Sequence, residues 1–402
     1  MQRLVILGGG FAGVWAALGA SKMRRQYAEK GADVEIVLVS RDRWLTIRPR
    51  LYEATLGDAR VPLDDALGPA GVDRVEGEIV QIDASARTVA IDGADGPRTL
   101  SYDRLLLAAG SHVKHPAIAG GEHAFLVDTF ADAHALDRHL ASLSTTKPGL
   151  QDEARFSAVV VGAGFTGIEV ATTLVARLRS AAAGTGTSAR VVLVDRASAL
   201  APDLGAAARQ HVERTLVTLG IESRVDRAVS AIDPTGILLN DGEWIPAHTV
   251  VWTGGFRASG LVAELPVERD ELGRVPVDDF LRVRGLEGIY AAGDVARAMA
   301  DATHVAPMSC QYAIPMGETA GVNAAADLLG VPLVPFAQPD YVTCLDLGEG
   351  GALFMQGWDR DVRLTGSWAK LLKATINQRL IYPPRARSDS PVDIPPRART
   401  AA

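Results

Sequence analysis

Two short runs of glycine have the spacing that binds a dinucleotide phosphate. Residues 8–13 fit the pattern G-x-G-x-x-G, and residues 162–167 repeat it. In this pattern the first glycine permits a tight turn, the second lets a pyrophosphate approach the backbone, and the third lets the following helix pack on the preceding strand. The phosphates then lie at the positive end of the helix, where free N–H groups point at them. The glycines concerned are Gly8, Gly10 and Gly13 in the first run and Gly162, Gly164 and Gly167 in the second.

Two acidic side chains stand where they could act on a nucleotide held by the second run. Asp195 ends the strand that follows this run, and a carboxylate in that place bonds a ribose 2′-hydroxyl and repels a 2′-phosphate. It therefore favours NADH over NADPH, although the adjacent Arg196 weakens the preference. Glu169 lies two residues past Gly167, whereas Trp15 holds the matching place in the first run, so the fold itself does not require an acid there. The alternative for Glu169 is an acid that only stabilises the helix dipole, by about 0.3–1 kcal/mol.

The elements around the two runs repeat in the same order. Each run follows a short apolar strand and precedes a helix, a second strand, an alternating segment typical of a β-meander, and a buried strand that ends in small residues. The strands and meander cover residues 4–7, 34–39, 78–91 and 102–110 in the first unit, and 158–161, 190–195, 229–244 and 249–255 in the second. We expect the first helix to extend to about Glu29, with Gly31 as its stop. The repeat predicts an α/β protein with two Rossmann-like dinucleotide-binding domains, each with an inserted β-meander.

The rest of the chain adds a return strand and a small C-terminal segment. Residues 288–295 predict another buried strand, a helix from Gln311 ends at Gly330, and residues 368–380 have the spacing of an amphipathic helix. The predicted divisions are residues 1–145 and 285–330 for the first domain, 146–284 for the second, 331–382 for a C-terminal α+β segment, and 383–402 for a disordered tail.

Composition limits the classes of protein to which the chain can belong. It has 402 residues, of which 48% are hydrophobic and only 5% aromatic, and an aliphatic core of this kind suits parallel sheets covered by helices. The net charge of −7 argues against a nucleic-acid surface. No apolar run approaches the about 18 residues of a membrane span, and the first strand begins too early for a signal peptide. Two cysteines give no disulfide framework, and no metal site is predicted. We therefore expect a cytoplasmic protein.

Together these features resemble the flavoproteins that carry two dinucleotide-binding domains. Within them the chain is most similar to type II NADH:quinone oxidoreductases and the related sulfide:quinone oxidoreductases, over roughly residues 3–380. The most specific parts are the second glycine run with Glu169, the triplet at 292–294 and the helix at Gln311. The resemblance implies hydride transfer from NADH to N5 of FAD, followed by electron transfer to a quinone or a similar small acceptor. NADPH stays open as a second donor.

The resemblance assigns the first unit to FAD. Ser40 stands where relatives carry an acid for the adenosine ribose; its hydroxyl could replace that acid, Asp42 could substitute, or Ser40 only ends its strand. Asp294 would accept hydrogen bonds from the ribityl hydroxyls, and the alternative is an aspartate that caps the next helix. The implied FAD contacts are Gly8, Gly10, Phe11, Ala12, Gly13, Ser40, Arg41, Pro49, Ile79, Ala109, Gly110, Gly293, Asp294 and Gln311.

The second unit is assigned to NADH. Glu169 would lie beside the nicotinamide and the flavin and assist proton movement, and the helix after Gln311 would direct its positive end at the flavin. The implied NADH contacts are Gly162, Gly164, Phe165, Thr166, Gly167, Glu169, Asp195, Arg196, Gly254 and Gly255.

The residues that would meet the electron acceptor match the relatives less well than those that would bind the two nucleotides. Quinone-reducing relatives carry Ala-Gln-x-Ala-x-Gln at the Gln311 helix, and here the second glutamine is replaced by Pro315, which puts direct quinone reduction in question. Cys310 would lie at a helix N-terminus, which lowers a thiol pKa and favours the thiolate. Cys344 resembles the essential cysteine segment of sulfide:quinone oxidoreductases, and we consider that both cysteines approach the flavin and each other. The alternative is that both are small buried hydrophobes. The candidate catalytic residues are Glu169, Gln311, Cys310 and Cys344.

Partners and location leave several options open. Lys370, Lys373 and Arg379 lie beside the apolar stripe of the last helix, so this basic end could rest weakly on the inner face of an anionic membrane. The alternative is a helix that only caps the domain. A homodimer is also open. Two other functions compete with NADH:quinone chemistry: a sulfide- or persulfide-oxidising flavoprotein that uses Cys344, and an NADH-sensing flavoprotein, similar to apoptosis-inducing-factor relatives, that acts through partner proteins.

Overall fold

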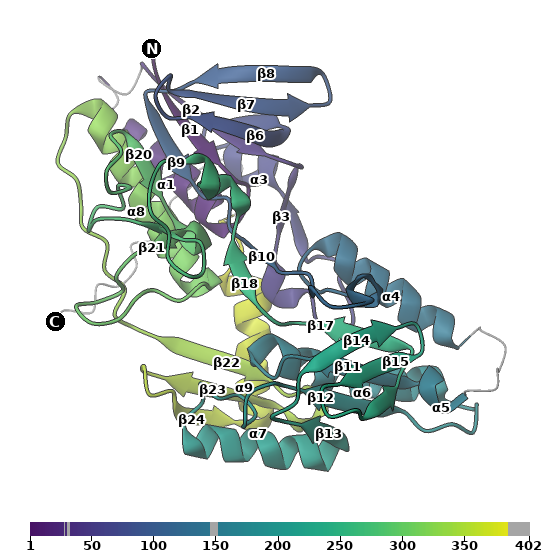
Figure 1. Cartoon of the computed structure of the whole chain (residues 1–402). Coiled ribbons are helices and arrows are strands. Elements are labelled where there is room, and N and C mark those ends of the chain that lie inside the picture. Colours follow the sequence, from purple (N-terminus) through teal and green to yellow (C-terminus); the bar gives the residue numbers. More distant parts are fainter. Residues whose placement is uncertain (28, 30–32, 145–151, 385–402) are drawn as a thin grey trace.

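A five-stranded parallel sheet forms the first layer of the protein. The computed structural model describes residues 1–27, 29, 33–144 and 152–384 (Figure 1). The strand order is β20-β9-β1-β2-β5, so the chain leaves this sheet after β9 and returns to it much later at β20. Most of its central side chains are buried and apolar, as expected for a parallel sheet covered on both faces. The strands are β1 (Gln2–Leu7), β2 (Val34–Ser40), β5 (Asp73–Glu76), β9 (Arg104–Leu107) and β20 (Ile289–Ala291).

A four-stranded parallel sheet repeats the arrangement in the second unit. Its order is β13-β12-β11-β17, with β11 in the place that β1 has in the first sheet. The strands are β11 (Ser157–Val161), β12 (Arg190–Val194), β13 (Ile221–Arg224) and β17 (Thr249–Trp252). The helices of this unit are α4 (Phe130–Leu143), α5 (Asp152–Arg155), α6 (Phe165–Ala182) and α7 (Ala206–Leu219).

Each unit also carries the predicted antiparallel meander. The first is β6 (Glu78–Asp83), β7 (Thr88–Gly93) and β8 (Gly96–Ser101), and the second is β14 (Val229–Asp233), β15 (Gly236–Leu239) and β16 (Trp244–Pro246). Strand β10 (Ser111–Val113) follows the first sheet and pairs with β18 (Phe256–Ala258), which follows the second, so this short ribbon joins the two units. The remaining short elements are β3 (Trp44–Thr46), η1 (Arg48–Arg50), β4 (Arg60–Pro62), α3 (Leu63–Leu67), η2 (Gly121–His123), η3 (Gly260–Glu264), β19 (Val275–Pro276), η4 (Gly293–Val295) and β21 (Ala296–Arg297).

Helices α1 (Phe11–Gln26) and α8 (Cys310–Leu329) pack unusually closely, side by side in Figure 1. A Cβ atom on Gly321 would lie 2.0 Å from the carbonyl oxygen of Ala16, and one on Gly317 would lie 2.2 Å from that of Ala12. Helix α8 ends, as predicted, at Gly330, which has the left-handed φ of +65°. These glycines therefore let α8 lie directly on α1.

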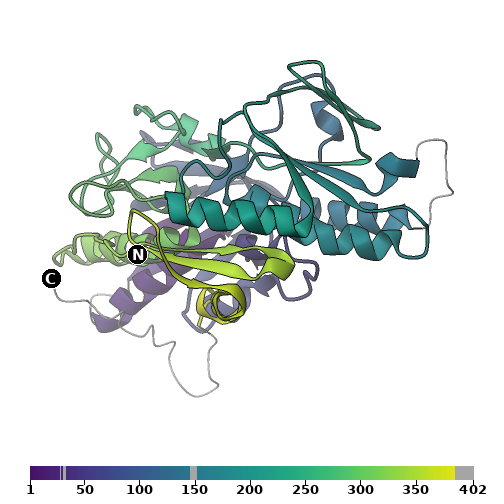
Figure 2. The ribbon, with the colours of Figure 1, turned by 90° about the horizontal axis from the view of Figure 1, so that it is seen from below.

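The C-terminal segment packs on the second unit. An antiparallel sheet of β22 (Val342–Asp346), β23 (Ala352–Gln356) and β24 (Asp361–Thr365) lies beside α7 (Figure 2), with the 3₁₀ turn η5 (Gly348–Gly350) between β22 and β23. The apolar side chains of β22 and β23 share a core with those of α6 and α7. Helix α9 (Gly366–Thr375) and the π-helical turn η6 (Ile376–Leu380) complete the segment.

The predicted α/β architecture with two Rossmann-like units is confirmed, whereas the predicted end of the first helix, at about Glu29, is wrong. Helix α1 ends at Gln26, because Tyr27 leaves the helical region with φ −115° and ψ 51°. The expected stop at Gly31 lies outside the described residues, as does the tail beyond Pro384. The domain boundaries stay a prediction. None of the helices within the described residues is long and apolar enough to cross a membrane.

The α1–α8 contact gives a direct stability prediction. Gly321→Ala places a methyl group against the backbone of α1, so we expect the free energy of unfolding to fall by about 1–3 kcal/mol. Calorimetric melting of the flavin-loaded protein should detect this as a lower Tm. Gly57→Ala is the control, because a Cβ on this exposed glycine meets no atom within 4 Å. Equal melting temperatures for the two variants would contradict the packing account.

Candidate functional site

The first glycine turn is closely packed at its first and third glycines, Gly8 and Gly13, and open at its second, Gly10. Gly8 has φ +119°, and a Cβ there would lie 2.3 Å from the carbonyl oxygen of Ala108. A Cβ on Gly13 would lie 1.8 Å from the carbonyl oxygen of Gly8. A Cβ on Gly10 would meet nothing within 4 Å, and Gly10 is exposed. The turn therefore leaves an open space at the N-terminus of α1, and it fits a pyrophosphate group.

The second glycine turn has the same packing. Gly162 has φ +106°, and its Cβ would lie 2.8 Å from Oγ1 of Thr253. A Cβ on Gly167 would lie 1.7 Å from the carbonyl oxygen of Gly162, whereas one on the exposed Gly164 would meet no atom within 4 Å. The chain thus contains two cradles of the same design, each at the start of a long helix, and both fit a dinucleotide.

The carboxylate of Asp195 stabilises the second cradle. It accepts hydrogen bonds from the backbone N–H of Ala163 and, at 2.7 Å, from that of Ala197. The N–H of Ala201 donates in turn to the carbonyl oxygen of Ala163 at 3.1 Å, so the loop after β12 wraps the glycine turn. Arg196 is exposed. Contact of Asp195 with a ribose hydroxyl stays a prediction.

Other predicted NADH contacts border the same turn. Phe165 and Thr166 form the first turn of α6, and Gly254 follows β17, where its carbonyl oxygen accepts from Nε1 of Trp252 at 3.0 Å. Gly255 has φ +80°, a conformation that few other residues adopt.

Some of the predicted FAD contacts lie at the first cradle, and the others lie on separate elements of the first unit. Ser40 is buried at the end of β2, and a Cβ on Gly9 would lie 2.4 Å from its Oγ, so its side chain lies under the glycine turn. Phe11 and Ala12 begin α1, and Gly293 packs on Ala12, because its Cβ would lie 2.8 Å from that of Ala12. The others are placed on neighbouring elements: Arg41 after β2, Pro49 in η1, Ile79 in β6, and Ala109 and Gly110 after β9.

Asp294 belongs to a polar cluster that the sequence did not reveal. Its carboxylate accepts from Oγ of Ser111 at 2.6 Å and lies 3.9 Å from Nη1 of Arg48, which also pairs with Asp128. Burial raises the pKa of Asp294, and the Ser111 hydroxyl and the Arg48 charge lower it in part. Arg48 precedes the predicted flavin contact Pro49, but nothing in its local sequence indicates a partner so far along the chain.

The start of α8 contradicts one expectation. Cys310 is the first residue of the helix, yet burial raises the pKa of its thiol to about 11. The prediction of a thiolate is therefore wrong, because loss of hydration outweighs the favourable helix end. Burial also raises the pKa of Cys344 to about 11, and the Lys373 ammonium lowers both thiol pKa values in part. Both thiols are free. Gln311 donates from Nε2 to the carbonyl oxygen of Asp340 at 3.0 Å.

Glu169 and Lys373 form a buried ion pair. Nζ of Lys373 lies 2.9 Å from Oε1 of Glu169, and the two side chains are only 11% and 10% exposed. The backbone N–H of Asp346 donates to the same oxygen at 3.0 Å, and Nζ of Lys373 donates to the carbonyl oxygen of Cys344 at 2.9 Å. Burial raises the pKa of Glu169, and Lys373 lowers it in part. Burial alone would lower the pKa of Lys373, but the Glu169 charge outweighs that effect and raises it.

A second ion pair adjoins the first. Nζ of Lys370 lies 2.7 Å from Oδ1 of Asp346, and the hydroxyl of Tyr52 donates to Oδ2 at 3.3 Å. Burial, with the nearby carboxylates, raises the pKa of Tyr52 well above its ordinary value. The sequence left open whether Lys370 and Lys373 rest on a membrane or belong to a helix that only caps the domain. In the structure both amines bind carboxylates, which agrees with a capping helix, and membrane contact stays a prediction. We call Glu169, Lys373, Asp346, Lys370 and Tyr52 the Glu169 cluster.

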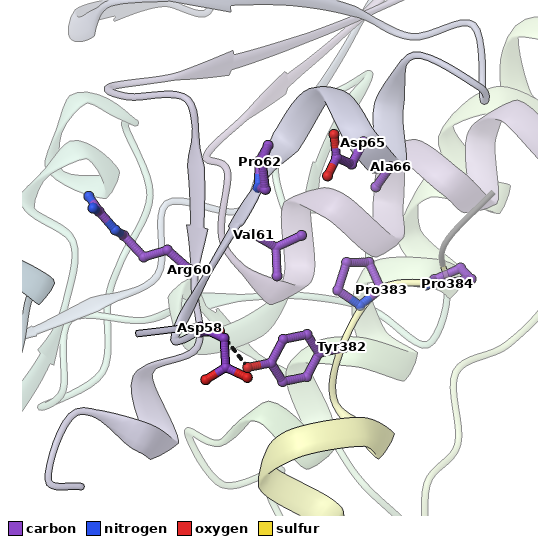
Figure 3. Close-up of a pocket in the computed structure, with 9 residues that line it drawn as sticks. All are labelled: Asp58, Arg60, Val61, Pro62, Asp65, Ala66, Tyr382, Pro383 and Pro384. Atoms are coloured by element: carbon purple, nitrogen blue, oxygen red, sulfur yellow. Dashed lines mark hydrogen bonds between the residues drawn. The ribbon is translucent and has the colours of Figure 1, made fainter. Parts of the chain in front are cut away.

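A small cavity of about 80 Å³ lies elsewhere, between the β4–α3 region and the chain that follows η6 (Figure 3). It is far smaller than the about 300–1,000 Å³ typical of ligand sites, so it is not a nucleotide site. The hydroxyl of Tyr382 donates to the carbonyl oxygen of Asp58 at 2.7 Å and closes one side. Its lining residues are Asp58, Arg60, Val61, Pro62, Asp65, Ala66, Tyr382, Pro383 and Pro384.

The buried pair predicts a pH-dependent stability in Lys373→Met. This variant leaves Glu169 buried without its cation, so we expect it to lose about 3–5 kcal/mol of stability where the carboxylate is charged. A carboxyl group whose pKa is raised in the folded state stabilises the fold below its unfolded pKa and loses this stabilisation as pH rises through its folded pKa. Tm measured between about pH 6 and pH 8 should therefore show a deficit that shrinks as pH falls.

The matched control is the double variant Glu169→Gln/Lys373→Met, in which no buried carboxyl group is left to titrate at this position. Its Tm should change less over the same pH interval than the Tm of Lys373→Met. A deficit in Lys373→Met that does not change with pH would show that Glu169 is not the group responsible.

Comparison with known proteins agrees with this geometry. The chain is 47% identical over 387 residues to an NADH dehydrogenase-like protein of Mycobacterium tuberculosis, covering 96% of this chain and 95% of the relative. It is 25% identical over 398 residues to a type II NADH:quinone oxidoreductase of Staphylococcus saprophyticus, covering 95% of each. The structure of NDH2 from Plasmodium falciparum in complex with NADH superposes with a TM-score of 0.79 over 95% of each chain, at 13% identity. Residues 2–317 match the model of the pyridine nucleotide-disulphide oxidoreductase family, to which the chain therefore belongs.

Proposed function

We propose that the protein oxidises NADH and passes the electrons to a quinone or a related small acceptor, with FAD in the first cradle and NADH in the second. The observation that carries this proposal is that the two cradles match: each is closely packed at its first and third glycines and open at its second, which is Gly10 or Gly164. The relatives support it, because they include an NADH dehydrogenase-like protein and a type II NADH:quinone oxidoreductase.

The side chains and backbone near the first cradle would hold FAD. The free N–H groups at the start of α1 would bind its pyrophosphate, and Asp294, oriented by Ser111 and Arg48, would accept from its ribityl hydroxyls. Bound FAD supplies a ring that accepts a hydride and then releases electrons to an acceptor. The N-terminus of α8 adds a positive dipole end on the same side.

The Glu169 cluster would handle the proton that accompanies acceptor reduction. Oε1 of Glu169 already accepts from Nζ of Lys373, and the raised pKa of its carboxyl group makes a protonated state accessible nearer to neutral pH. Lys373 would hold the carboxylate in place after it has lost a proton. This assigns Glu169 to the acceptor step and not to the reaction with NADH.

Anaerobic stopped-flow kinetics test this function. We expect NADH to bleach the flavin absorbance faster than NADPH, and a soluble quinone to restore it with steady turnover. Glu169→Gln should bleach within about three-fold of the wild-type rate but lose at least about ten-fold in quinone turnover, as expected for a lost proton-transfer group.

The control for Glu169→Gln is Glu349→Gln, which removes an exposed carboxylate that pairs with Arg179 and should leave both rates unchanged. No bleaching by NADH would refute the proposed function. Bleaching without turnover by any quinone would favour the NADH-sensing alternative. Bleaching by sulfide that is lost in Cys344→Ser would favour sulfide oxidation, an alternative that the raised thiol pKa of Cys344 disfavours.

We also propose weak peripheral membrane contact through α9 and η6. Trp368, Leu371 and Leu380 are 71%, 58% and 64% exposed, and Arg379 is exposed beside them. Apolar side chains of this kind insert at a membrane interface more readily than the two lysines, which point inward. Whether the protein forms a homodimer stays a prediction.

Vesicle co-sedimentation tests the membrane contact. Trp368→Ser/Leu371→Ser should reduce binding to vesicles of phosphatidylcholine and phosphatidylglycerol, while NADH-dependent reduction of a soluble quinone stays unchanged. Val217→Ser, on the exposed face of α7, is the control and should bind as the wild type does. Equal sedimentation of all three proteins would contradict this contact.

A further inference from the structure

The tip of the β23–β24 hairpin reaches the second cradle from the C-terminal segment. The tip consists of residues 357–360, and both Gly357 and Arg360 have left-handed φ angles, of +79° and +54°. The N–H of Arg360 donates to the carbonyl oxygen of Gly357 at 3.0 Å and closes the turn. A left-handed arginine is strained, and strain of this kind clusters at ligand-binding positions.

Arg360 is positioned by three segments, of which two border the cradle. Its Nη1 donates to the carbonyl oxygen of Asp203, in the loop that also wraps the glycine turn, and its Nη2 donates to the hydroxyl of Tyr341 at 3.2 Å. The guanidinium carbon lies 5.2 Å from the ring centroid of Phe165, the residue directly after the open Gly164. The charge is therefore held over the first turn of α6.

The same corner collects polar atoms that have no partner. Within the described part of the chain, Nε of Arg360 is buried without a hydrogen bond, and so are Nε1 of Trp358 and the hydroxyl of Tyr312. The ring of Tyr341 lies 4.7 Å from that of Trp358 and 6.0 Å from that of Tyr312, and the rings of Trp358 and Tyr312 are 6.2 Å apart. Buried polar atoms in folded proteins are nearly always satisfied, so these three donors are available to a bound molecule or to water.

We propose that Arg360 binds the pyrophosphate of the nicotinamide nucleotide and that the hairpin tip forms a third wall of the NADH site. A pyrophosphate carries two negative charges, and the planar guanidinium is the side chain best suited to phosphate oxygens. Backbone N–H groups of the cradle bind one side of this group, and Arg360 binds the other. The proposal rests on NADH binding at the second cradle and adds a residue that neither glycine run contains.

Arg360→Gln tests the proposal in the flavin-loaded protein, with ADP-ribose as the probe because it contains the pyrophosphate without the nicotinamide. Loss of one charge-assisted contact should raise its Kd about ten-fold or more, raise KM for NADH by a similar factor, and leave kcat within about two-fold. Arg360→Lys should recover part of the affinity. Arg363→Gln is the matched control, an exposed arginine three residues along that pairs only with Asp361 among the described residues.

Hydrogen exchange of the wild-type holoprotein supplies a readout that needs no variant. ADP-ribose should slow exchange both in a peptide that covers residues 162–167 and in one that covers residues 357–361. Protection of the first peptide alone, or an unchanged Kd in Arg360→Gln at normal flavin content and Tm, would overturn the proposal for Arg360. Protection of neither peptide would instead refute NADH binding at the second cradle.

Discussion

The missing side chain at the third glycine of each run is the constraint on which the structure depends. At Gly13 and at Gly167 the space of a Cβ is filled by the carbonyl oxygen of the first glycine of the same run, 1.8 Å and 1.7 Å from that position. This contact brings the helix start beneath the turn, so that free N–H groups point into the open space left at the second glycine. The parallel sheets, the close α1–α8 packing and the loop around Ala163 all hold this arrangement in place.

The C-terminal segment is connected to the second unit by charge as well as by apolar packing. A buried ion pair such as Glu169–Lys373 stabilises a fold weakly, because desolvation offsets the attraction, but it is costly to break. The pair therefore links α9, which packs on β22–β24, to α6, and it presents a titratable carboxyl group beside the second cradle. The hairpin tip with Arg360 approaches the same cradle from the other end of this segment, so one small α+β segment would serve both nucleotide binding and proton supply.

The local features of this chain could be predicted from sequence, and the long-range pairings could not. Glycine spacing, strand periodicity and the helix stop at Gly330 depend on neighbouring residues, so the two units, both meanders and α8 were found. Lys373 pairs with Glu169, and Arg360 packs over the ring of Phe165, although each partner lies far away along the chain. Locally, Lys373 lies in an ordinary amphipathic helix pattern and Arg360 in an ordinary hairpin turn, so neither pairing could be predicted. The thiolate expected at Cys310 failed for a related reason: the helix end is a local feature, whereas burial is set by the whole fold.

Filling the open space of each cradle tests the central claim most directly. Gly164→Val should leave the flavin bound, with its visible absorbance intact, and abolish both ADP-ribose binding and bleaching by NADH. Gly10→Val should fold without flavin. If Gly164→Val were reduced by NADH as fast as the wild type, or if Gly10→Val kept its flavin, the assignment of one dinucleotide to each cradle would be contradicted.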